Sequence, residues 1–525
     1  MRARERVCHY TCLAFLLVAG TILFFSRLEG TLSLWDEAYY AAVSKGSYNH
    51  HLILFPAANP GERACKSALF FWLADLSFMI FGVSGYGLRF PSAVGAFAGV
   101  IFLYLIGRKF YGTRVGFLAA LFLLTSREYH LYPRNTMHDP LMLAFQLGFV
   151  WCAIQREKTR PWHMALGGAF LGLALFLKQF LGLSVLGPVL LYWWWGKAWP
   201  KASRKSWLLG FASFYLFGCG WYTIAAFYDF SHVRTLLFTY NLTERFTQEL
   251  DTDPWFWVKF FTDFPRQGPH PILYAGFFAS VWSVVEFFRK REGGLVLFGS
   301  WLWALVFVLH LATFRAVHYA LPMYPCLCLF IALMADRLWT GDWNGIDLIA
   351  LGWSTAYLLL NVAPGWLSVI PFGTPLGKAL ILGVCLALLF RPKWPLPRYV
   401  RSAAAGLVVG TSVWIAAEMP PRADYGRDTF GAIESVWEEK GRDATIHADF
   451  FAYYHVLWYH DGPAILVNEM PDSTLPIPEG DGYLFAMSGE FETWPADRYD
   501  LLKDTGFFKM VRFHPPRRAV ETQSG

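Results

Sequence analysis

The sequence predicts an all-α polytopic membrane protein with a small α/β domain at its C-terminal end. Hydrophobic residues make up 55% of the 525 residues, aromatic residues 18% and charged residues only 16%. A water-soluble globular protein keeps about 25% charged residues for its surface, so this composition excludes a soluble fold for most of the chain. After residue 417 the composition becomes that of an ordinary soluble protein, with Pro420-Pro421 at the boundary.

Apolar segments recur along the first four fifths of the chain. The first, residues 11–25, follows Arg2, Arg4 and Arg6 and has no small-residue cleavage site after it, so we expect a retained span with its N-terminus inside. Further apolar segments cover residues 67–81, 91–106, 115–125, 140–154, 164–177, 181–195, 207–227, 271–288, 295–313, 317–334, 346–362, 376–390 and 402–417.

The basic loops decide the topology. If every segment crossed the membrane, Arg108, Arg114 and Arg156 would lie outside, against the positive-inside rule. If residues 67–81 lie on the outer face instead, every later basic loop becomes cytoplasmic. At ~1.5 Å per residue this segment is also shorter than the roughly 30 Å hydrocarbon core. We therefore expect about 13 spans and a C-terminus outside. The cytoplasmic loops are then residues 108–114, 156–160, 197–205, 289–291 and 391–401.

The remaining polar clusters then fall on the outer face, although only the basic loops were used to choose the topology. These outer groups are Asp36, Glu37, Lys66, Arg134 to Asp139, Lys178, Arg245, Arg315 and His318. Ionisable groups near apolar segments are expensive unless they line a polar cavity. Their convergence predicts a reaction chamber on a membrane body.

The chain divides into a transmembrane domain, residues 1–418 with a large outer loop at 29–90, and a C-terminal domain, residues 419–525. The C-terminal residues show short apolar runs typical of strands and amphipathic runs typical of helices. We expect strands at 444–447, 464–467, 483–487 and 508–513, and helices at 429–440 and 450–459. A domain of about 100 residues is large enough to fold on its own, and we place it on the outer face.

Two acidic positions are candidates for catalysis. Asp36-Glu37 ends the first apolar segment, where a carboxylate can act as a general base or hold a divalent cation. The same pair is equally typical of an acidic helix cap, with Tyr40 anchored in the headgroup region. Asp139 precedes Pro140 at the start of a span, so it is either a second functional carboxylate or an N-cap. We expect its neighbour His138 to be a solvated loop histidine.

The basic candidates suit a phosphate. Lys66 opens an apolar segment and can bind a lipid phosphate, although snorkelling to the interface is the simpler explanation. Lys178 ends a helix between two apolar runs, a costly position unless it faces a polar cavity. Arg245 and Arg315 have the planar guanidinium that recognises phosphate oxygens. Arg134 and His318 are further candidates on the same face.

As an ordered set, these residues resemble bacterial members of the protein mannosyltransferase and lipid A aminoarabinose transferase superfamily. The resemblance covers roughly the first 340 residues. The motifs that carry it are Asp36-Glu37-Ala38 with Tyr40, Lys66 before Leu69-Phe70-Phe71-Trp72, Arg134, Asp139, Lys178, Asn241-Leu242 with Arg245-Phe246, and His318-Tyr319 with Leu321-Pro322. The resemblance implies the glycosyltransferase C fold, a body of many spans with an outer cavity.

The resemblance also implies roles for single residues. Asp36 would be the essential acid and Asp139 the second acid, while Lys66, Lys178 and Arg245 would bind the donor phosphate. This chain departs from the aminoarabinose transferases at a few matching positions. They are Tyr39 for arginine, Cys65 for glutamate, Ser67-Ala68 for a Pro-Pro pair and Tyr240 for histidine. The missing glutamate and histidine are associated with metal in those relatives, so Asp36 and Asp139 are the remaining candidates for a divalent cation.

The function predicted from these observations is glycosyl transfer. A hexosyl or pentosyl unit would move from a polyprenyl phosphate to a lipid, glycan or protein acceptor on the periplasmic face of a bacterial inner membrane. A charged lipid donor requires no nucleotide-binding motif and no nucleic-acid partner. A lipid or solute transporter is the alternative, whose inverted halves with matching broken spans are not apparent. A non-catalytic, carbohydrate-binding scaffold is the third hypothesis.

Overall fold

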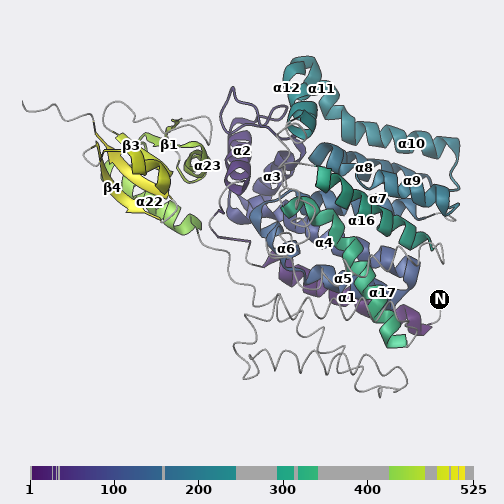
Figure 1. Ribbon diagram of the computed structural model, residues 1–525. Coiled ribbons are helices and arrows are strands. Elements are labelled where there is room, and N and C mark those ends of the chain that lie inside the picture. Colours follow the sequence, from purple (N-terminus) through teal and green to yellow (C-terminus); the bar gives the residue numbers. More distant parts are fainter. Residues whose placement is uncertain are drawn as a thin grey trace, which may run out of the picture. The chain divides into compact units, whose positions relative to one another are not determined.

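A computed structural model of the chain (Figure 1) describes residues 3–243, 292–311, 317–340 and 425–514. Short gaps within these ranges are residues 27, 31, 34–35, 156–159, 461, 468–481, 496–497 and 506–507. The apolar segments expected at 271–288, 346–362, 376–390 and 402–417 lie outside the described residues, as do Arg245 and Arg315. The expected number of spans and the domain boundary near residue 419 therefore stay predictions.

The chain forms two compact units. Unit 1 comprises residues 1–26, 92–134 and 138–419, and unit 2 comprises residues 27–91, 135–137 and 420–525. The helix α4 (Gly85–Tyr111) begins in unit 2 and continues into unit 1, and the 3-10 helix η1 (Pro133–Asn135) adjoins both. Unit 2 thus combines the segment between the first and second long apolar helices with the C-terminal part of the chain.

Unit 1 is helical throughout its described residues. Its other helices are α1 (Ala3–Phe25), α5 (Thr113–Leu124), α6 (Arg127–Leu131), α7 (Asp139–Ala153), α8 (Pro161–Gly182), α9 (Leu186–Trp195), α10 (Arg204–Phe214), η2 (Tyr215–Cys219), α11 (Gly220–Tyr228), α12 (Phe230–Arg234), η3 (Thr235–Thr243), α16 (Gly293–Leu311), η4 (Val317–Met323) and α17 (Tyr324–Thr340). The positions of these helices confirm the apolar segments expected between residues 91 and 334 that the structure describes.

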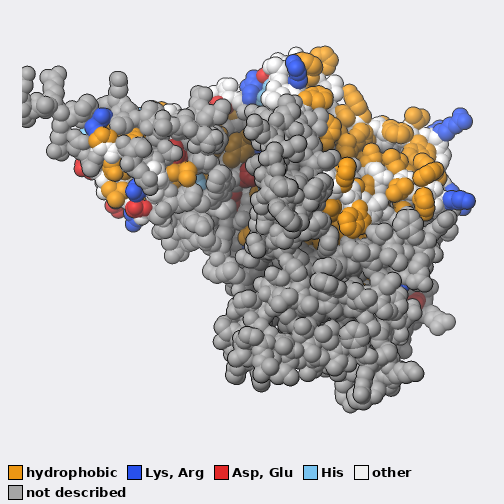
Figure 2. Space-filling view, in the orientation of Figure 1, with side chains coloured by type: hydrophobic (Ala, Val, Ile, Leu, Met, Phe, Trp, Pro, Cys, Tyr) orange, Lys and Arg blue, Asp and Glu red, His pale blue; other side chains and the backbone are white. Residues whose placement is uncertain are grey.

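Five stretches of these helices are long and apolar enough to cross a membrane, judged by length and composition within the described residues. They are Glu5–Phe25, Gly85–Tyr111, Pro161–Gly182, Arg204–Tyr228 and His318–Arg337. Large apolar side chains of the fourth stretch point outward, including Leu208, Phe211, Leu216 and Phe227. Figure 2 shows hydrophobic side chains gathered over α9 and α10, with lysine and arginine at one end of these helices. This pattern is typical of a surface that faces lipid.

Glycines allow α8 to pack closely against its neighbour. A Cβ added at Gly168 would lie 2.0 Å from the carbonyl oxygen of Gly210, and one at Gly172 would lie 2.8 Å from the nitrogen of Gly218. Helices in membranes associate through such small residues, because their backbones approach closely without a hydrophobic driving force. The α8 contact with α10 and η2 therefore depends on the absence of side chains.

Unit 2 contains two helices of the outer loop, α2 (Asp36–His50) and α3 (Leu69–Phe81). The helix α3 has 13 residues and is not among the stretches long enough to span. Its Phe70 and Phe71 pack on Tyr40 of α2, and its Phe78 packs on Tyr48. Its short length supports the expected position on the outer face, which remains a prediction.

The C-terminal residues form a five-stranded mixed sheet with two helices. The elements are α22 (Tyr425–Lys440), β1 (Ile446–Ala448), α23 (Phe450–Tyr459), β2 (Ala464–Leu466), β3 (Gly482–Met487), η5 (Ser488–Thr493), β4 (Tyr499–Asp504) and β5 (Phe508–Phe513). The strand order is β2-β1-β3-β5-β4. The strand β1 is parallel to both neighbours, and β5 is antiparallel to both of its own.

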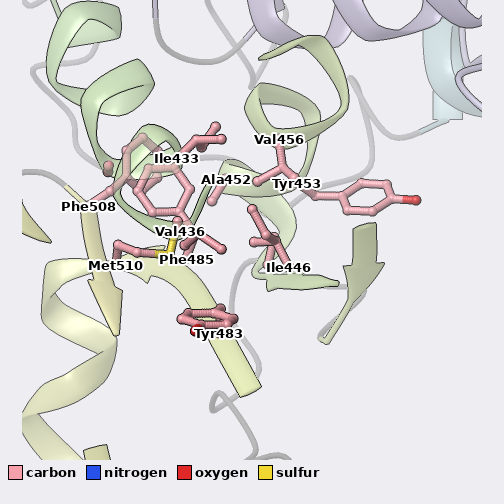
Figure 3. Packing of buried hydrophobic residues seen from close by; sticks show 12 residues of the cluster. Ile433, Val436, Ile446, Ala452, Tyr453, Val456, Tyr483, Phe485, Phe508 and Met510 are labelled. Atoms are coloured by element: carbon pink, nitrogen blue, oxygen red, sulfur yellow. The ribbon is translucent and has the colours of Figure 1, made fainter. Parts of the chain in front are cut away.

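The core of this C-terminal module lies between the sheet and its helices. Ile433 and Val436 of α22 meet Val456 of α23, with Phe485 and Met510 of the sheet (Figure 3). The four strands and two helices expected from sequence are confirmed, and α22 begins four residues earlier than expected. The expected set lacked β4, an edge strand in which Tyr499 and Leu502 are half-buried and the other residues are exposed. Its pairing with β5 is irregular between Leu501 and Lys503. Its apolar residues therefore do not alternate with polar ones, which leaves no strand pattern to detect.

The close approach of α8 and α10 can be tested with Gly168→Ala. Because the new Cβ would meet a backbone oxygen at 2.0 Å, the helices must move apart. We expect the purified variant to lose about 1–3 kcal/mol of stability, the usual cost of overpacking. The control is Gly187→Ala in α9, where an added Cβ meets nothing within 4 Å. Thermal unfolding in detergent measures both, and equal midpoints for the two variants would contradict the packing described here.

Asp75 of α3 should make the stability of the protein depend on pH. Burial raises the pKa of Asp75 from 3.8 to about 7, and its Oδ1 has no hydrogen-bond partner among the described residues. The protonated form is therefore favoured by folding, so this stability is fully present below pH 3.8 and is lost as pH rises through 7.

Asp75→Asn should remove that loss. The carboxyl group is only partly buried, so solvent reduces the free energy that corresponds to its pKa shift. We expect Asp75→Asn to be about 1 kcal/mol more stable than the parent at pH 8. The two proteins should be similar near pH 4. Unfolding midpoints measured across this pH range test the difference, with the exposed Asp443→Asn as control. A constant difference at all pH values would contradict a titrating Asp75.

Candidate active site

Glu37 is the centre of a buried hydrogen-bond network in unit 2. It follows Asp36 in the first turn of α2 and is 1% exposed. Its Oε1 accepts from Arg89 Nε at 2.8 Å and from Thr136 Oγ1 at 2.7 Å. Its Oε2 accepts from the backbone nitrogen of Ser33 at 2.6 Å and from Ser33 Oγ at 2.9 Å. Both carboxylate oxygens are thus occupied by the protein itself.

Arg89 extends this network to the chain before α2. Its Nη1 donates to the carbonyl oxygens of Leu28 at 2.6 Å and Gly30 at 3.1 Å, and the residue is 1% exposed. Gly30 has a φ of +126°, a conformation that favours glycine. One guanidinium therefore joins the segment at Leu28 and Gly30, the start of α2 and the start of α4.

Thr136 shows that this arrangement is enforced. Its φ is +52°, although it is β-branched and such residues rarely adopt positive φ. The residue is fully buried and donates to Glu37. A strained conformation persists only where its surroundings over-determine it, and such residues cluster at functional sites. The Glu37 carboxylate provides that constraint here.

Asp36 is in a different environment from its neighbour. It is exposed at the N-terminus of α2, while Glu37 is enclosed. An exposed acid at this point is accessible to a substrate, and an acid whose two oxygens already accept hydrogen bonds is not. The sequence predicted catalytic roles for both residues. In this structure Asp36 is the accessible acid and Glu37 holds the loop, and the catalytic role of each stays a prediction.

The segment before α3 lies against α2. The backbone nitrogen of Cys65 donates to Tyr39 Oη at 2.8 Å, and Cys65 Sγ lies 3.2 Å from the same oxygen. Burial, followed by the neighbouring Cys65, raises the pKa of the Tyr39 phenol well above its ordinary value, so the phenol stays neutral. Lys66, next in the chain, is half-buried. Tyr40, another candidate, is buried against Phe70 and serves packing.

A second polar cluster lies in unit 1. Asp139 begins α7 and is fully buried, and its Oδ1 forms an ion pair with Lys178 Nζ. The other oxygen, Oδ2, has no hydrogen-bond partner within the described part of the chain. Lys178 Nζ also lies 4.5 Å from the centre of the Tyr319 ring, a cation–π contact.

Lys178 stands where α8 is interrupted. Lys178 and Gln179 have non-helical backbone angles, and Gln179 has a φ of +41°. The helix expected to end at Lys178 therefore does break there, and a short second piece runs on to Gly182. Gln146 Nε2 donates to the carbonyl oxygens of Leu181 at 2.9 Å and Gly182 at 3.2 Å, which lie at the end of this second piece. At the break the lysine pairs with Asp139.

Three other candidates, His318, Arg134 and His138, also lie within the described residues. The His318 ring lies 6.2 Å from the Tyr132 ring, and Arg134 Nη2 donates to the carbonyl oxygen of Leu23 at 3.1 Å. His138 precedes α7 and is 5% exposed, so the expectation of a solvated loop histidine was wrong. It is enclosed because the segment before Asp139 folds inward.

The sequence predicted a possible divalent cation at Asp36 and Asp139. Among the described residues no group of three or more histidine, cysteine, aspartate or glutamate side chains is arranged to hold a metal. One oxygen of Asp139 is already paired with an ammonium, which repels a second cation. The divalent cation at Asp36 and Asp139 stays a prediction.

Several residues of the network were missed by the sequence analysis. Arg89 is the main one, and a single charge just before the apolar segment 91–106 was the available signal. Ser33 and Thr136 carry no pattern, because their role depends on a carboxylate elsewhere in the chain. Tyr319 was identified only as part of a motif, not as the ring beneath Lys178.

Comparisons with known sequences agree with the resemblance. The family described as dolichyl-phosphate-mannose-protein mannosyltransferase matches residues 66–221. An uncharacterised protein of Aquifex aeolicus is 23% identical over 324 residues, 60% of this chain and 62% of that protein. An undecaprenyl phosphate-alpha-4-amino-4-deoxy-L-arabinose arabinosyl transferase of Proteus mirabilis is 26% identical over 171 residues, 30% of this chain and 31% of that protein. Each of these matches spans less than two thirds of the relative.

Solved structures show the fold. ArnT from Cupriavidus metallidurans, bound to undecaprenyl phosphate, superimposes with a TM-score of 0.69 at 16% identity, covering 97% of this chain and 98% of that one. The Archaeoglobus fulgidus oligosaccharyltransferase gives a TM-score of 0.55 at 12% identity, covering 91% of this chain and 69% of that one. The expected glycosyltransferase C fold and the similarity to the mannosyltransferase and aminoarabinose transferase superfamily are confirmed.

The buried hydrogen bonds of Glu37 predict a loss of stability when its charge is removed. Glu37→Gln leaves the buried Arg89 guanidinium without its counter-charge, and breaking such a pair costs about 3–5 kcal/mol. Asp36→Asn, one residue away and exposed, should change stability by no more than about 0.5 kcal/mol. Unfolding midpoints of the purified proteins measure both.

A double variant supplies the control for this pair. Glu37→Gln combined with Arg89→Met removes both charges, so it should be less destabilised than the sum of the two single variants. If Glu37→Gln instead unfolded like the parent protein yet lost all activity, the original catalytic prediction for Glu37 would stand.

Proposed function

We propose that the protein is an integral-membrane glycosyltransferase that uses a polyprenyl-phosphate sugar as donor. The observation that carries the proposal is the accessible Asp36 on a loop fixed by the buried Glu37 network. This loop also carries Lys66, in a chain with the glycosyltransferase C fold. The ArnT structure was determined with undecaprenyl phosphate, which supports a lipid phosphate as the donor carrier here.

Asp36 is proposed as the general base. A hydroxyl or amine acceptor becomes a better nucleophile when a positioned carboxylate takes its proton during attack. Asp36 meets the two requirements for this role, since it is solvent-exposed and its backbone is held by the hydrogen bonds of the adjacent Glu37. A base on a rigid loop keeps its geometry without reorganisation.

Lys66 and Lys178 are proposed to bind the donor phosphate. The leaving polyprenyl phosphate gains negative charge as the glycosidic bond breaks, and fixed cations stabilise that charge. Lys178 is held by Asp139 and the Tyr319 ring, so its ammonium is oriented before a substrate arrives. Oδ2 of Asp139 has no hydrogen-bond partner within the described residues, and we propose that it accepts a hydrogen bond from a hydroxyl group of the substrate. Arg245 and Arg315 remain part of this proposal, together with Arg134 and His318.

The arrangement of unit 1 supports a reaction on the outer face. Lys109 donates to Gln155 at 3.3 Å, and Arg114 pairs with Asp336 at 2.9 Å, so the ends of α4, α7 and α17 meet at one end of the bundle. Asp139 begins α7 and therefore lies at the opposite end. The basic loops and the proposed phosphate site are separated by the length of α7. We place the former in the cytoplasm and the latter in the periplasm of a bacterial inner membrane.

The acceptor is proposed to be a lipid, a glycan or a protein, and the transferred unit a hexose or pentose. Comparing lipids and glycans by mass spectrometry in host cells with and without the protein would identify both. The product that disappears names the acceptor, and its mass difference names the sugar.

The different roles of Asp36 and Lys66 predict different kinetic losses. Asp36→Asn removes the base, so turnover should fall by roughly 10²–10⁴-fold while donor binding stays nearly unchanged. Lys66→Ala should weaken donor binding as well as turnover, since the phosphate charge is present before the reaction and grows during it. The assay is transfer from a synthetic polyprenyl-phosphate sugar by detergent-purified protein, with donor binding measured separately.

Matched controls are Asp443→Asn and Lys440→Ala, which change exposed residues of the C-terminal module. Both should behave like the parent protein. Full turnover in Asp36→Asn would refute the general-base role. Equal losses of donor binding in Asp36→Asn and Lys66→Ala would place Asp36 at the phosphate instead of at the acceptor.

A further inference from the structure

One face of the C-terminal helix α23 contacts the loop that carries Asp36. The backbone nitrogen of Leu32 donates to Tyr459 Oη at 2.8 Å, and Lys45 Nζ donates to the carbonyl oxygen of Trp458 at 3.0 Å. These contacts join residues more than 400 positions apart. The two hydrogen bonds attach α23 to the segment before α2 and to α2 itself.

Aromatic packing completes the contact. The Tyr454 ring meets the Tyr39 ring edge to face at 5.1 Å, and the Trp458 ring lies 6.4 Å from Phe78 of α3. A buried cluster of the loop residues Leu32, Ala38, Ala41, Phe78 and Leu88 is packed against Tyr454, Trp458 and Tyr459. The same face of α23 thus covers α2, α3 and the start of α4.

The other face of α23 is fixed to the sheet. Ala452 and Val456 are fully buried in the core of the C-terminal module. Asp449 caps the helix, with Oδ1 accepting from the nitrogen of Ala452 at 2.7 Å and Oδ2 accepting from the nitrogen of Met487 in β3 at 2.7 Å. The helix cannot shift against the loop without disturbing the sheet. It therefore offers a rigid surface to the loop.

We infer that the C-terminal module is a positioning element for the proposed active site, acting through Tyr454 and Tyr459 of α23. Tyr459 holds the backbone at Leu32, four residues before Asp36. Tyr454 holds Tyr39, whose hydroxyl holds Cys65, the neighbour of Lys66. The proposed base and one proposed phosphate ligand are thus each one short step from the helix. No group of α23 touches a substrate in this assignment.

The physical basis is the placement of a base. A shift of about 1 Å in a catalytic group can cost up to roughly 10²-fold in rate, so a rigid partner for the loop matters even at a distance. Leu32 is buried, so its backbone nitrogen needs the hydroxyl of Tyr459 as an acceptor. The expected effect on turnover rests on the proposed function. The expected effect on the order of the loop is independent of that function.

The experiment compares Tyr459→Phe and Tyr454→Ala with Tyr499→Phe. Tyr499 lies in β4 of the same module and packs on a different cluster, beside Phe491 and Trp494. Tyr499→Phe is therefore the matched control. Two quantities are measured on the full-length protein in detergent. One is transfer, as turnover and donor affinity, and the other is the rate of Cys65 alkylation, followed by peptide mass spectrometry. Cys65 is a native exposed thiol in the segment beside Lys66.

We expect Tyr459→Phe to lower turnover by roughly 10-fold with donor affinity unchanged, since it releases only the Asp36 side. Tyr454→Ala should raise the Cys65 alkylation rate several-fold and weaken both turnover and donor affinity, since it releases Tyr39 and with it the Cys65–Lys66 segment. Tyr499→Phe should match the parent protein in every measurement.

Parental turnover and parental Cys65 alkylation in both α23 variants would overturn the inference. Lost turnover with unchanged alkylation in Tyr454→Ala would also overturn it, because the effect would not pass through the loop. If the parent protein transfers no sugar, the proposed function fails, and Cys65 alkylation alone still decides whether α23 orders the loop.

Discussion

The buried ion pair between Glu37 and Arg89 is the interaction on which the candidate site depends. Removing two charges from water is expensive, and the cost is offset only when the pair is close and its remaining hydrogen-bonding groups are satisfied. Here Ser33, Thr136 and two backbone carbonyl oxygens complete the set. The network tolerates a positive φ at Thr136 and leaves Asp36 at the surface. A stable buried acid thus supports an accessible one.

Unit 1 also contains a buried ion pair. Asp139 and Lys178 are paired where α8 departs from helical geometry, and Gln146 satisfies two carbonyl oxygens at the end of α8. An apolar bundle accepts ionisable groups only when they compensate one another or face a cavity. The break in α8 therefore serves to orient a cation. The same physical rule accounts for the glycine contacts of α8, where the backbones approach because no side chain intervenes.

The C-terminal module contacts the loop that carries Asp36, although the two are far apart in the sequence. Its helix α23 packs on both sides, with one face in the core against the sheet and the other on the loop before α3. Tyr454 and Trp458, one helical turn apart, present their rings on the same side of the helix. In the proposal made above, this contact orders the loop that carries Asp36. Among its described acids and histidines, no group of three or more is arranged to hold a metal ion.

The sequence by itself determined the features that depend on local composition. Hydrophobicity located α4, α8 and α16, and alternating apolar runs located β1 and β3, because both signals are contained in adjacent residues. An ordered set of polar residues identified the fold class. Only the tertiary structure distinguished Asp36 from Glu37, because burial of the second acid depends on Arg89, 52 positions later, and on the strained Thr136. Likewise, only the tertiary structure shows that Lys178 pairs with Asp139 and that α23 packs on α2. Both features are contacts between residues far apart in the sequence, which a local pattern does not contain.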